Sequence, residues 1–268
     1  MSLNPLAPVT NYESKLSRIF WFTSIATVAA IWLLRDNVPA LDLALQKIDF
    51  KLGAGENLPL PGGYLLPALV VGLVSRVFRL HDRISDLLGI RERFDIDVII
   101  AELAAQSGFD LAEITDPQLI RQRSQIMGKA FYRFTSSKNP QVDEHLIHQA
   151  LDWWSWLWVV LEAVLVFVLT GLALIAFRVP SLGIAVMFGS LAVAALSLPI
   201  IWSQCRRYAV AQVAAIMSDP ALATQVVDVL HDTLSPARTE LAGWHVNGAG
   251  SAKHSAAMED RWSRHLRR

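Results

Sequence analysis

The sequence predicts an all-α, polytopic membrane protein whose four transmembrane helices form two hairpins joined by a helical insert. Three observations predict this class. Four long apolar segments lie at about 19–34, 58–75, 153–177 and 182–202. Basic residues are concentrated on one predicted side of these segments, as in cytoplasmic loops. Seven of the nine tryptophans lie in or beside the segments, and an indole ring favours the headgroup boundary.

The four segments differ in how well they fit a bilayer. A hydrocarbon core about 30 Å thick requires roughly 20 apolar residues in a helix. The third and fourth segments reach this length, the third with one charged residue, Glu162, and the fourth with none. The first is shorter, but Arg18 and Arg35 at its ends can bury their stems and keep their charges at the interface. The second requires Leu58–Gly63 and contains three prolines, so we expect the least regular span there.

Charge next to the spans predicts their orientation. Basic side chains gather at the start of the first span and at the ends of the second and fourth, namely Lys15, Arg18, Arg76, Arg79, Arg83, Arg206 and Arg207. The opposite ends carry fewer basic residues. This bias predicts that both termini and the insert are cytoplasmic, in a multi-pass protein of the plasma (inner) membrane.

The spans divide the chain into five predicted units. Residues 1–75 form an N-terminal membrane hairpin and residues 153–203 a C-terminal one. Between them, residues 76–152 form a cytoplasmic helical insert, and residues 204–234 form further cytoplasmic helices. We expect residues 235–268 to be largely disordered, because they are rich in Gly, Ala, Ser and His and have no apolar stripe.

Helix signals recur through the insert. Apolar residues at helical spacing predict a helix over 91–107 that Gly108 ends. Thr115-Asp116-Pro117 predicts the start of the next helix, on which Arg123 interrupts the apolar face. From Pro140 neither proline nor glycine occurs before Gly171, so we expect one helix from about Pro140 to Phe177, about 60 Å long at 1.5 Å per residue. Ser218-Asp219-Pro220 predicts a last helix start.

Composition excludes several function classes. The 24 basic and 24 acidic residues balance, so no overall field favours nucleic acid, and no nucleic-acid partner is expected. The single cysteine, Cys205, excludes an intramolecular disulfide and a cysteine-based zinc site. No phosphate-binding loop, dinucleotide fingerprint or nucleophile elbow is present. We therefore expect no cofactor and no enzymatic activity.

Glu162 is the main candidate functional residue, because it is the one ionisable side chain well inside a span. Such groups are costly and often mark ion paths or proton relays. Three interpretations are open for Glu162: an ion or proton pathway, a structural pair with Arg76, and exposure at the interface.

Two further groups have helical spacing. Arg76, Arg79 and Arg83 would form one stripe at the inner face; anchoring to lipid phosphates is the favoured interpretation and an anionic ligand site the alternative. His145, His148 and Asp152 also share a predicted face and are weak candidates for metal ligands. They lack the order of a zinc-peptidase motif, so ordinary polar contacts are favoured and no metal is expected.

The function expected from these features is non-enzymatic. Cytoplasmic helices would couple to the membrane bundle through the long third span, as in a sensor, a regulatory subunit or a membrane-acting effector. One alternative is a homo-oligomeric ion channel or transporter component with a ring of Glu162 side chains. A metal-dependent membrane enzyme using His145 and His148 is the weakest alternative. The expected partners are the lipid bilayer, a second copy of the chain, and a cytoplasmic protein or anionic ligand; small residues four apart, such as Ala185 and Gly189, would allow close helix approach.

Overall fold

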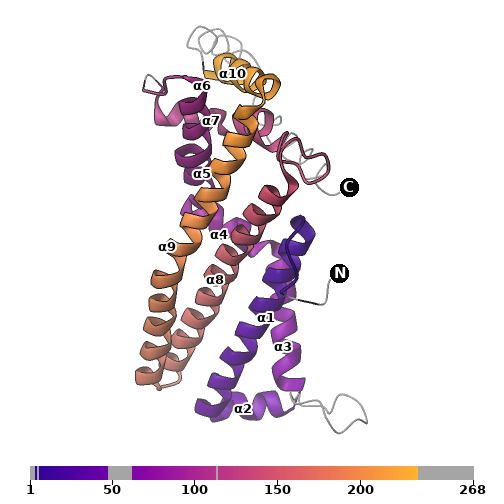
Figure 1. The fold of residues 1–268 in the computed structure, drawn as a ribbon. Coiled ribbons are helices and arrows are strands. Elements are labelled where there is room, and N and C mark those ends of the chain that lie inside the picture. Colours follow the sequence, from indigo (N-terminus) through magenta and orange to yellow (C-terminus); the bar gives the residue numbers. More distant parts are fainter. Residues whose placement is uncertain (1–3, 5, 48–61, 113, 235–268) are drawn as a thin grey trace, which may run out of the picture.

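The computed structural model describes residues 4, 6–47, 62–112 and 114–234, and Figure 1 shows this part of the chain as helices only. The all-α prediction is therefore confirmed for these residues. The predicted disordered tail at 235–268 and the first four residues of the second predicted span lie outside the described residues.

Three helices are long and apolar enough to cross a membrane: α1 (Tyr12–Asn37), α8 (Glu144–Ala176) and α9 (Pro180–Ser218). A fourth crossing requires α3 (Gly62–Phe78) and α4 (Leu80–Leu88) together, and these two helices are bent by 58°. The bend is at Arg79, whose φ of 49° is left-handed. Length and composition thus support three to four spans, the second being the irregular one.

The long helices pack as two pairs. Figure 1 shows α8 and α9 side by side along most of the molecule, with α1 against α8 and α3 against α1. The short helix α2 (Pro39–Gln46) lies at the far end of α1 and leads toward α3. We call α1, α3, α8 and the first part of α9 the apolar helices.

Glycines set how closely these helices approach. A Cβ atom on Gly183 of α9 would lie 2.5 Å from the carbonyl oxygen of Gly171 in α8. The two backbones therefore touch at this point, as is typical of helices packed through small residues. A Cβ on Gly189 would meet no atom within 4 Å. Within the chain, the close approach uses Gly171 and Gly183 and not the predicted pair of Ala185 and Gly189.

The remaining helices form what we call the helical head. It contains α5 (Ile90–Phe94), η1 (Asp95–Ile100), α6 (Ala101–Ser107), α7 (Asp116–Ile126), η2 (Met127–Tyr132) and α10 (Pro220–Leu234), packed around the last part of α9. Gly108 ends α6 in the left-handed conformation, and Pro117 and Pro220 lie at helix starts, as predicted. Both η1 and η2 are π-helical, with the wider turn that recurs at functional sites.

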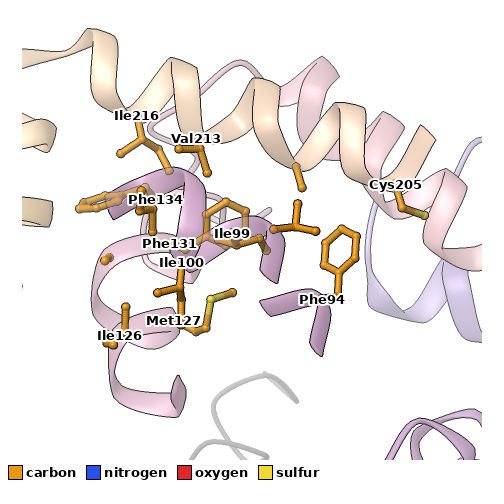
Figure 2. Close-up of a cluster of buried hydrophobic side chains, with 14 of the residues drawn as sticks. Phe94, Ile99, Ile100, Ile126, Met127, Phe131, Phe134, Cys205, Val213 and Ile216 are labelled. Carbon is orange, nitrogen blue, oxygen red and sulfur yellow. The ribbon is translucent and has the colours of Figure 1, made fainter. Parts of the chain in front are cut away.

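One hydrophobic core joins the head to the apolar helices. Figure 2 shows Phe134 on the side of α9 that carries Val213 and Ile216, and Phe94 farther along α9, toward Cys205. The same cluster continues, through further side chains, to Ile19 of α1 and to Leu157 and Trp158 of α8. Phe94 itself packs edge-on against Trp154 and Trp202, with ring centroids 4.8 and 5.1 Å away. These tryptophans therefore belong to the core as well as to the ends of the apolar segments.

The long helix predicted from Pro140 to Phe177 is confirmed as α8, with no break near residues 151–154. It begins four residues later than predicted. The reason is a cap: the side chain of Asp143 accepts a hydrogen bond of 2.9 Å from the backbone N–H of His145, which satisfies a donor at the helix start. α8 and α9 are therefore the continuous elements that connect the two ends of the molecule.

Candidate functional site

The side chain of Glu162 is buried at the centre of a contact between four helices. It belongs to α8 and is 1% exposed. Thr23 Oγ1 of α1 donates a hydrogen bond of 2.7 Å to its Oε2 atom, and Ser75 Oγ of α3 donates one of 2.5 Å to the same oxygen. His81 of α4 lies on the other side of the carboxyl group. We call these four residues the Glu162 site.

Three buried polar atoms of the Glu162 site lack hydrogen-bond partners within the described residues. His81 Nδ1 is 3.8 Å from Glu162 Oε1, which is too long for a hydrogen bond. Within the described residues, neither ring nitrogen of His81 nor Oε1 of Glu162 has a hydrogen-bond partner. Both side chains are buried, and a buried polar atom without a partner costs free energy. Such exceptions are uncommon and point to a strained or functional site.

The bend between α3 and α4 places His81 in this position. α3 ends at Phe78, the left-handed Arg79 turns the chain, and α4 starts at Leu80. His81 therefore lies in the first turn of a helix that meets α8. Its ring packs beside the indole of Trp158, one turn before Glu162 on α8, with the centroids 5.9 Å apart.

Two interpretations of Glu162 are wrong. Its burial excludes exposure at the interface. The structural pair with Arg76 is also wrong, because the Arg76 guanidinium lies 3.1 Å from Glu13 Oε2 and 3.4 Å from Ser17 Oγ. Arg76 turns toward the start of α1, where it pairs with a largely exposed carboxylate, so it does not extend inward along α8.

The predicted stripe of arginines is also wrong as one helical face. Arg76 is on α3 and Arg83 on α4, and the helix breaks between them at Arg79. Arg79 lies 3.5 Å from Asp82 and over the ring of Tyr12, while Arg83 lies over the ring of Phe78. The prediction of one stripe assumed a continuous helix from Arg76 to Arg83. The left-handed conformation of Arg79 interrupts that helix.

The candidate metal ligands are not brought together. Asp152 binds Arg18, a buried residue of α1, at 2.7 Å. The guanidinium of Arg18 also donates hydrogen bonds to Ser155 Oγ and to the carbonyl oxygen of Ala7. His148 faces Glu144 at 3.4 Å. In the part of the chain that the structure describes, no three His, Cys, Asp or Glu side chains are grouped to hold a metal ion.

A second buried carboxyl group lies in the helical head. Asp95 Oδ2 accepts a hydrogen bond of 3.0 Å from Arg123, and the Tyr132 hydroxyl is 3.4 Å from Oδ1. Arg91 in turn donates to the Tyr132 hydroxyl at 3.2 Å. Burial raises the pKa of Asp95 to about 6, against the lowering effect of the two guanidinium groups. Burial also raises the pKa of Tyr132. Arg123, which interrupts the predicted apolar face, therefore forms an ion pair with Asp95.

Sequence reasoning missed the partners of Glu162. Thr23 and Ser75 lie inside or at the end of predicted spans, and their hydroxyl groups are the signal that could have revealed them. His81 lies a few residues beyond the end of the second predicted span, where no sequence signal indicates a contact with the third. An apolar groove lined by Leu157, Leu161, Ala195, Leu198, Pro199 and Trp202, with Ile90, lies between α8 and α9, but Glu162 does not line it. Because Glu162 is 1% exposed, its site is enclosed and is suited to a proton or to a structural contact.

Comparison with known proteins adds the family. The YmfE protein family matches residues 11–227. The chain belongs to the YmfE protein family. The matched region contains both the apolar helices and nearly all of the helical head, together with every residue of the Glu162 site. Neither a curated protein nor a solved structure matches this chain.

Proposed function

We propose that this protein couples a cytoplasmic helical head to a membrane bundle, as a sensor, a regulatory subunit or a membrane-acting effector without enzymatic activity. In this proposal α3 and α4 supply the fourth crossing, both termini and the head are cytoplasmic, and the membrane is the plasma (inner) membrane. The head would bind a cytoplasmic protein or an anionic ligand. The concentration of basic residues at the head-side ends of the apolar helices supports this orientation.

The observation that carries the proposal is the continuity of α8 and α9 with the head core. The buried side chains of Val213 and Ile216 belong to the same helix that touches α8 at Gly183. Near the head, Gln212 Nε2 donates a hydrogen bond of 3.2 Å to the carbonyl oxygen of Leu146 in α8. Closely packed interiors transmit displacement, and packed helices have a few discrete arrangements. A change in the head core is therefore expected to move the α8–α9 pair.

The channel alternative has less support. A pore lined by a ring of Glu162 requires this side chain to face a neighbouring copy. It faces Thr23, Ser75 and His81 of its own chain, and it is buried without any second copy. An oligomeric ring would have to open the packing of α1, α3 and α4 on α8.

The test measures whether a change in the head moves the apolar helices. Spin labels replace the exposed residues Val70 on α3 and Leu169 on α8, in a Cys205→Ala background and in lipid nanodiscs. Ile216→Ala removes a buried side chain of the head core, and Ile120→Ala makes the same change at an exposed position of α7. We expect Ile216→Ala to shift the distance distribution between the labels and Ile120→Ala to leave it unchanged.

Two results would contradict the proposal. An unchanged distribution in folded Ile216→Ala, checked by size-exclusion chromatography, would show that the head and the apolar helices move independently. Ion flux into liposomes that is lost in Glu162→Ala would favour the channel instead. A milder variant, Ile216→Val, keeps the first comparison available when Ile216→Ala does not fold.

A further inference from the structure

His81 lies between two carboxyl groups. Its Nδ1 atom is 3.8 Å from Glu162 Oε1, and its Nε2 atom is 3.4 Å from Asp82 Oδ1. A neutral imidazole carries one N–H group, so one of the two nitrogens faces a carboxyl oxygen with a lone pair. One further proton would allow both ring nitrogens of His81 to form hydrogen bonds with the two carboxyl groups.

We propose that Glu162, His81 and Asp82 form a proton-binding relay, in which Glu162 holds the proton and Asp82 exchanges it with the solvent. In the protonated state Glu162 Oε1–H donates to His81 Nδ1, and His81 Nε2–H donates to Asp82. The two ring nitrogens of His81 and Oε1 of Glu162 then each gain a partner, after Oε1 and Nδ1 close by about 1 Å and Nε2, now 3.4 Å from Asp82 Oδ1, comes into hydrogen-bond alignment with it.

The surrounding charges favour a proton over a counter-ion at Glu162. The titratable and charged groups around the relay include Tyr12, Lys15 and Arg18 on α1, Arg76 on α3, Arg79 at the bend, Arg91 on α5, and Asp152 on α8. Two of these guanidinium groups pair with other carboxylates, Arg18 with Asp152 and Arg76 with Glu13. An ionised carboxyl group without a cation is costly among apolar helices, and taking up a proton removes its charge.

Asp82 is suited to exchange the proton with water. Its side chain is 35% exposed, whereas those of His81 and Glu162 are 1% and 0% exposed. Tyr12 donates a hydrogen bond of 3.2 Å to Oδ2 of Asp82, Arg79 lies 3.5 Å away, and Lys15 acts on both Asp82 and His81 through its charge. In the relay Asp82 accepts from His81 Nε2–H, and the proton moves inward by exchange on the two nitrogens of the imidazole.

The proton also sets how α4 meets α8. Without it, either the lone pair of Nδ1 faces Oε1 of an ionised Glu162, or Nδ1 carries the N–H group and the lone pair of Nε2 faces Asp82, so one of the two contacts of His81 is lost. Resting on the coupling proposed above, proton release would therefore loosen α4 from α8 at the Arg79 bend and alter the contact between the head and the apolar helices.

Infrared difference spectroscopy on the full chain in nanodiscs tests the relay. The background is Asp95→Asn, because the buried carboxyl group of Asp95 in the head would give a titrating band of its own. We expect this protein to lose the carbonyl band of a protonated carboxylic acid as pH rises, and the further change Glu162→Gln to abolish this band at every pH. Glutamine keeps an oxygen for Thr23 and Ser75, so the fold is retained. Glu13→Gln is the control, because it removes the exposed partner of Arg76 and should retain the band. A titrating band that persists when Glu162→Gln is added to Asp95→Asn, or the absence of the band from Asp95→Asn alone, would overturn the proposal.

Two further variants separate a proton site from a purely structural contact. Thr23→Val removes one donor to Oε2, which disfavours the ionised form, so the midpoint of the titration should rise by about one pH unit. Asp82→Asn should slow the appearance of the band after a pH jump at least tenfold. An unchanged midpoint or an unchanged rate would contradict the site or the route, respectively.

The spin-label pair distinguishes this proposal from the proposed function. A pH-dependent distance between positions 70 and 169 that disappears in Glu162→Gln would support both. Titration of Glu162 with an unchanged distance would leave the proton site standing and overturn its coupling to the helices.

Discussion

The helical head and the apolar helices each bury a carboxyl group, and they neutralise it in different ways. In the head, Asp95 binds Arg123 directly and meets Arg91 through the Tyr132 hydroxyl. Among the apolar helices, Glu162 has two hydroxyl donors and, within the described residues, no Lys or Arg partner. Charge pairing inside the chain compensates Asp95, whereas the proposed compensation of Glu162 is a proton taken up from the solvent. The comparison indicates that the head supplies its own counter-charges and that the Glu162 contact does not.

The two regions also pack differently. Large buried side chains such as Phe94, Phe134 and Ile100 fill the head. The apolar helices instead approach through Gly171 and Gly183, and through Gly72 of α3, whose Cβ would overlap Ser24 Oγ. Burial of apolar surface stabilises the first kind of packing, but lipid tails are as apolar as leucine and give no such driving force. Close contact between helix backbones therefore holds the apolar helices together.

The largest expected effect breaks the head core. Phe134 lies in the turn that follows η2, and its ring is fully buried. We expect Phe134→Ala to lower the free energy of unfolding by about 4 kcal/mol. The measurement is a denaturant titration of detergent-solubilised protein, followed by tryptophan fluorescence.

The matched control is Phe188→Ala on the apolar part of α9. This ring is 69% exposed, so its loss leaves no cavity and should cost less than about 0.5 kcal/mol. A loss at Phe188 as large as that at Phe134 would contradict the distinction between a packed head and an open apolar surface.

The next effect tests the ion pair of the head through pH. The pKa of Asp95 is about 6 in the folded protein, above its value of about 3.9 in an unfolded chain. Between these values the folded state binds a proton that the unfolded state has lost. The free energy of unfolding should therefore fall by about 3 kcal/mol as pH rises from about 4 to about 6, and stay level above that. Denaturant titrations across this range measure the fall.

Asp95→Asn should remove that fall, because asparagine does not titrate. Asp97→Asn, two residues away and exposed, should retain it and thereby account for all other titrating groups. Equal pH profiles for the wild type and Asp95→Asn would show that the Asp95 carboxyl is ionised throughout, with Arg123 outweighing its burial.

Local signals predicted much of this fold. Gly108, Pro117 and Pro220 mark helix ends because their backbone preferences act over a few residues, and the structure confirms each one. The absence of proline and glycine before Gly171 was likewise enough to predict the length of α8. Its start was displaced because the Asp143 side chain, and not the preceding proline, caps it.

The candidate site was less accessible from sequence, because its contacts join distant segments. Glu162 itself was found from its position in an apolar segment. Its pairing with Arg76 was not, since the choice of Glu13 depends on how α1 and α3 pack. The approach of His81 depends on the left-handed Arg79, a non-glycine conformation that has no local sequence signal.

The smallest of these effects tests the close contact between α8 and α9. In Gly171→Ala the new Cβ would lie 2.6 Å from the carbonyl oxygen of Gly183 and overlap the Met187 side chain. Met187 can move, but the backbone of α9 can yield only by separating from α8. We therefore expect the free energy of unfolding to fall by about 2 kcal/mol, as in other overpacked interiors. Gly189→Ala adds the same methyl group to α9 where nothing lies within 4 Å, and it should leave stability unchanged or higher. Equal losses in both variants would mean that helix contact plays no part and that glycine is needed for another reason.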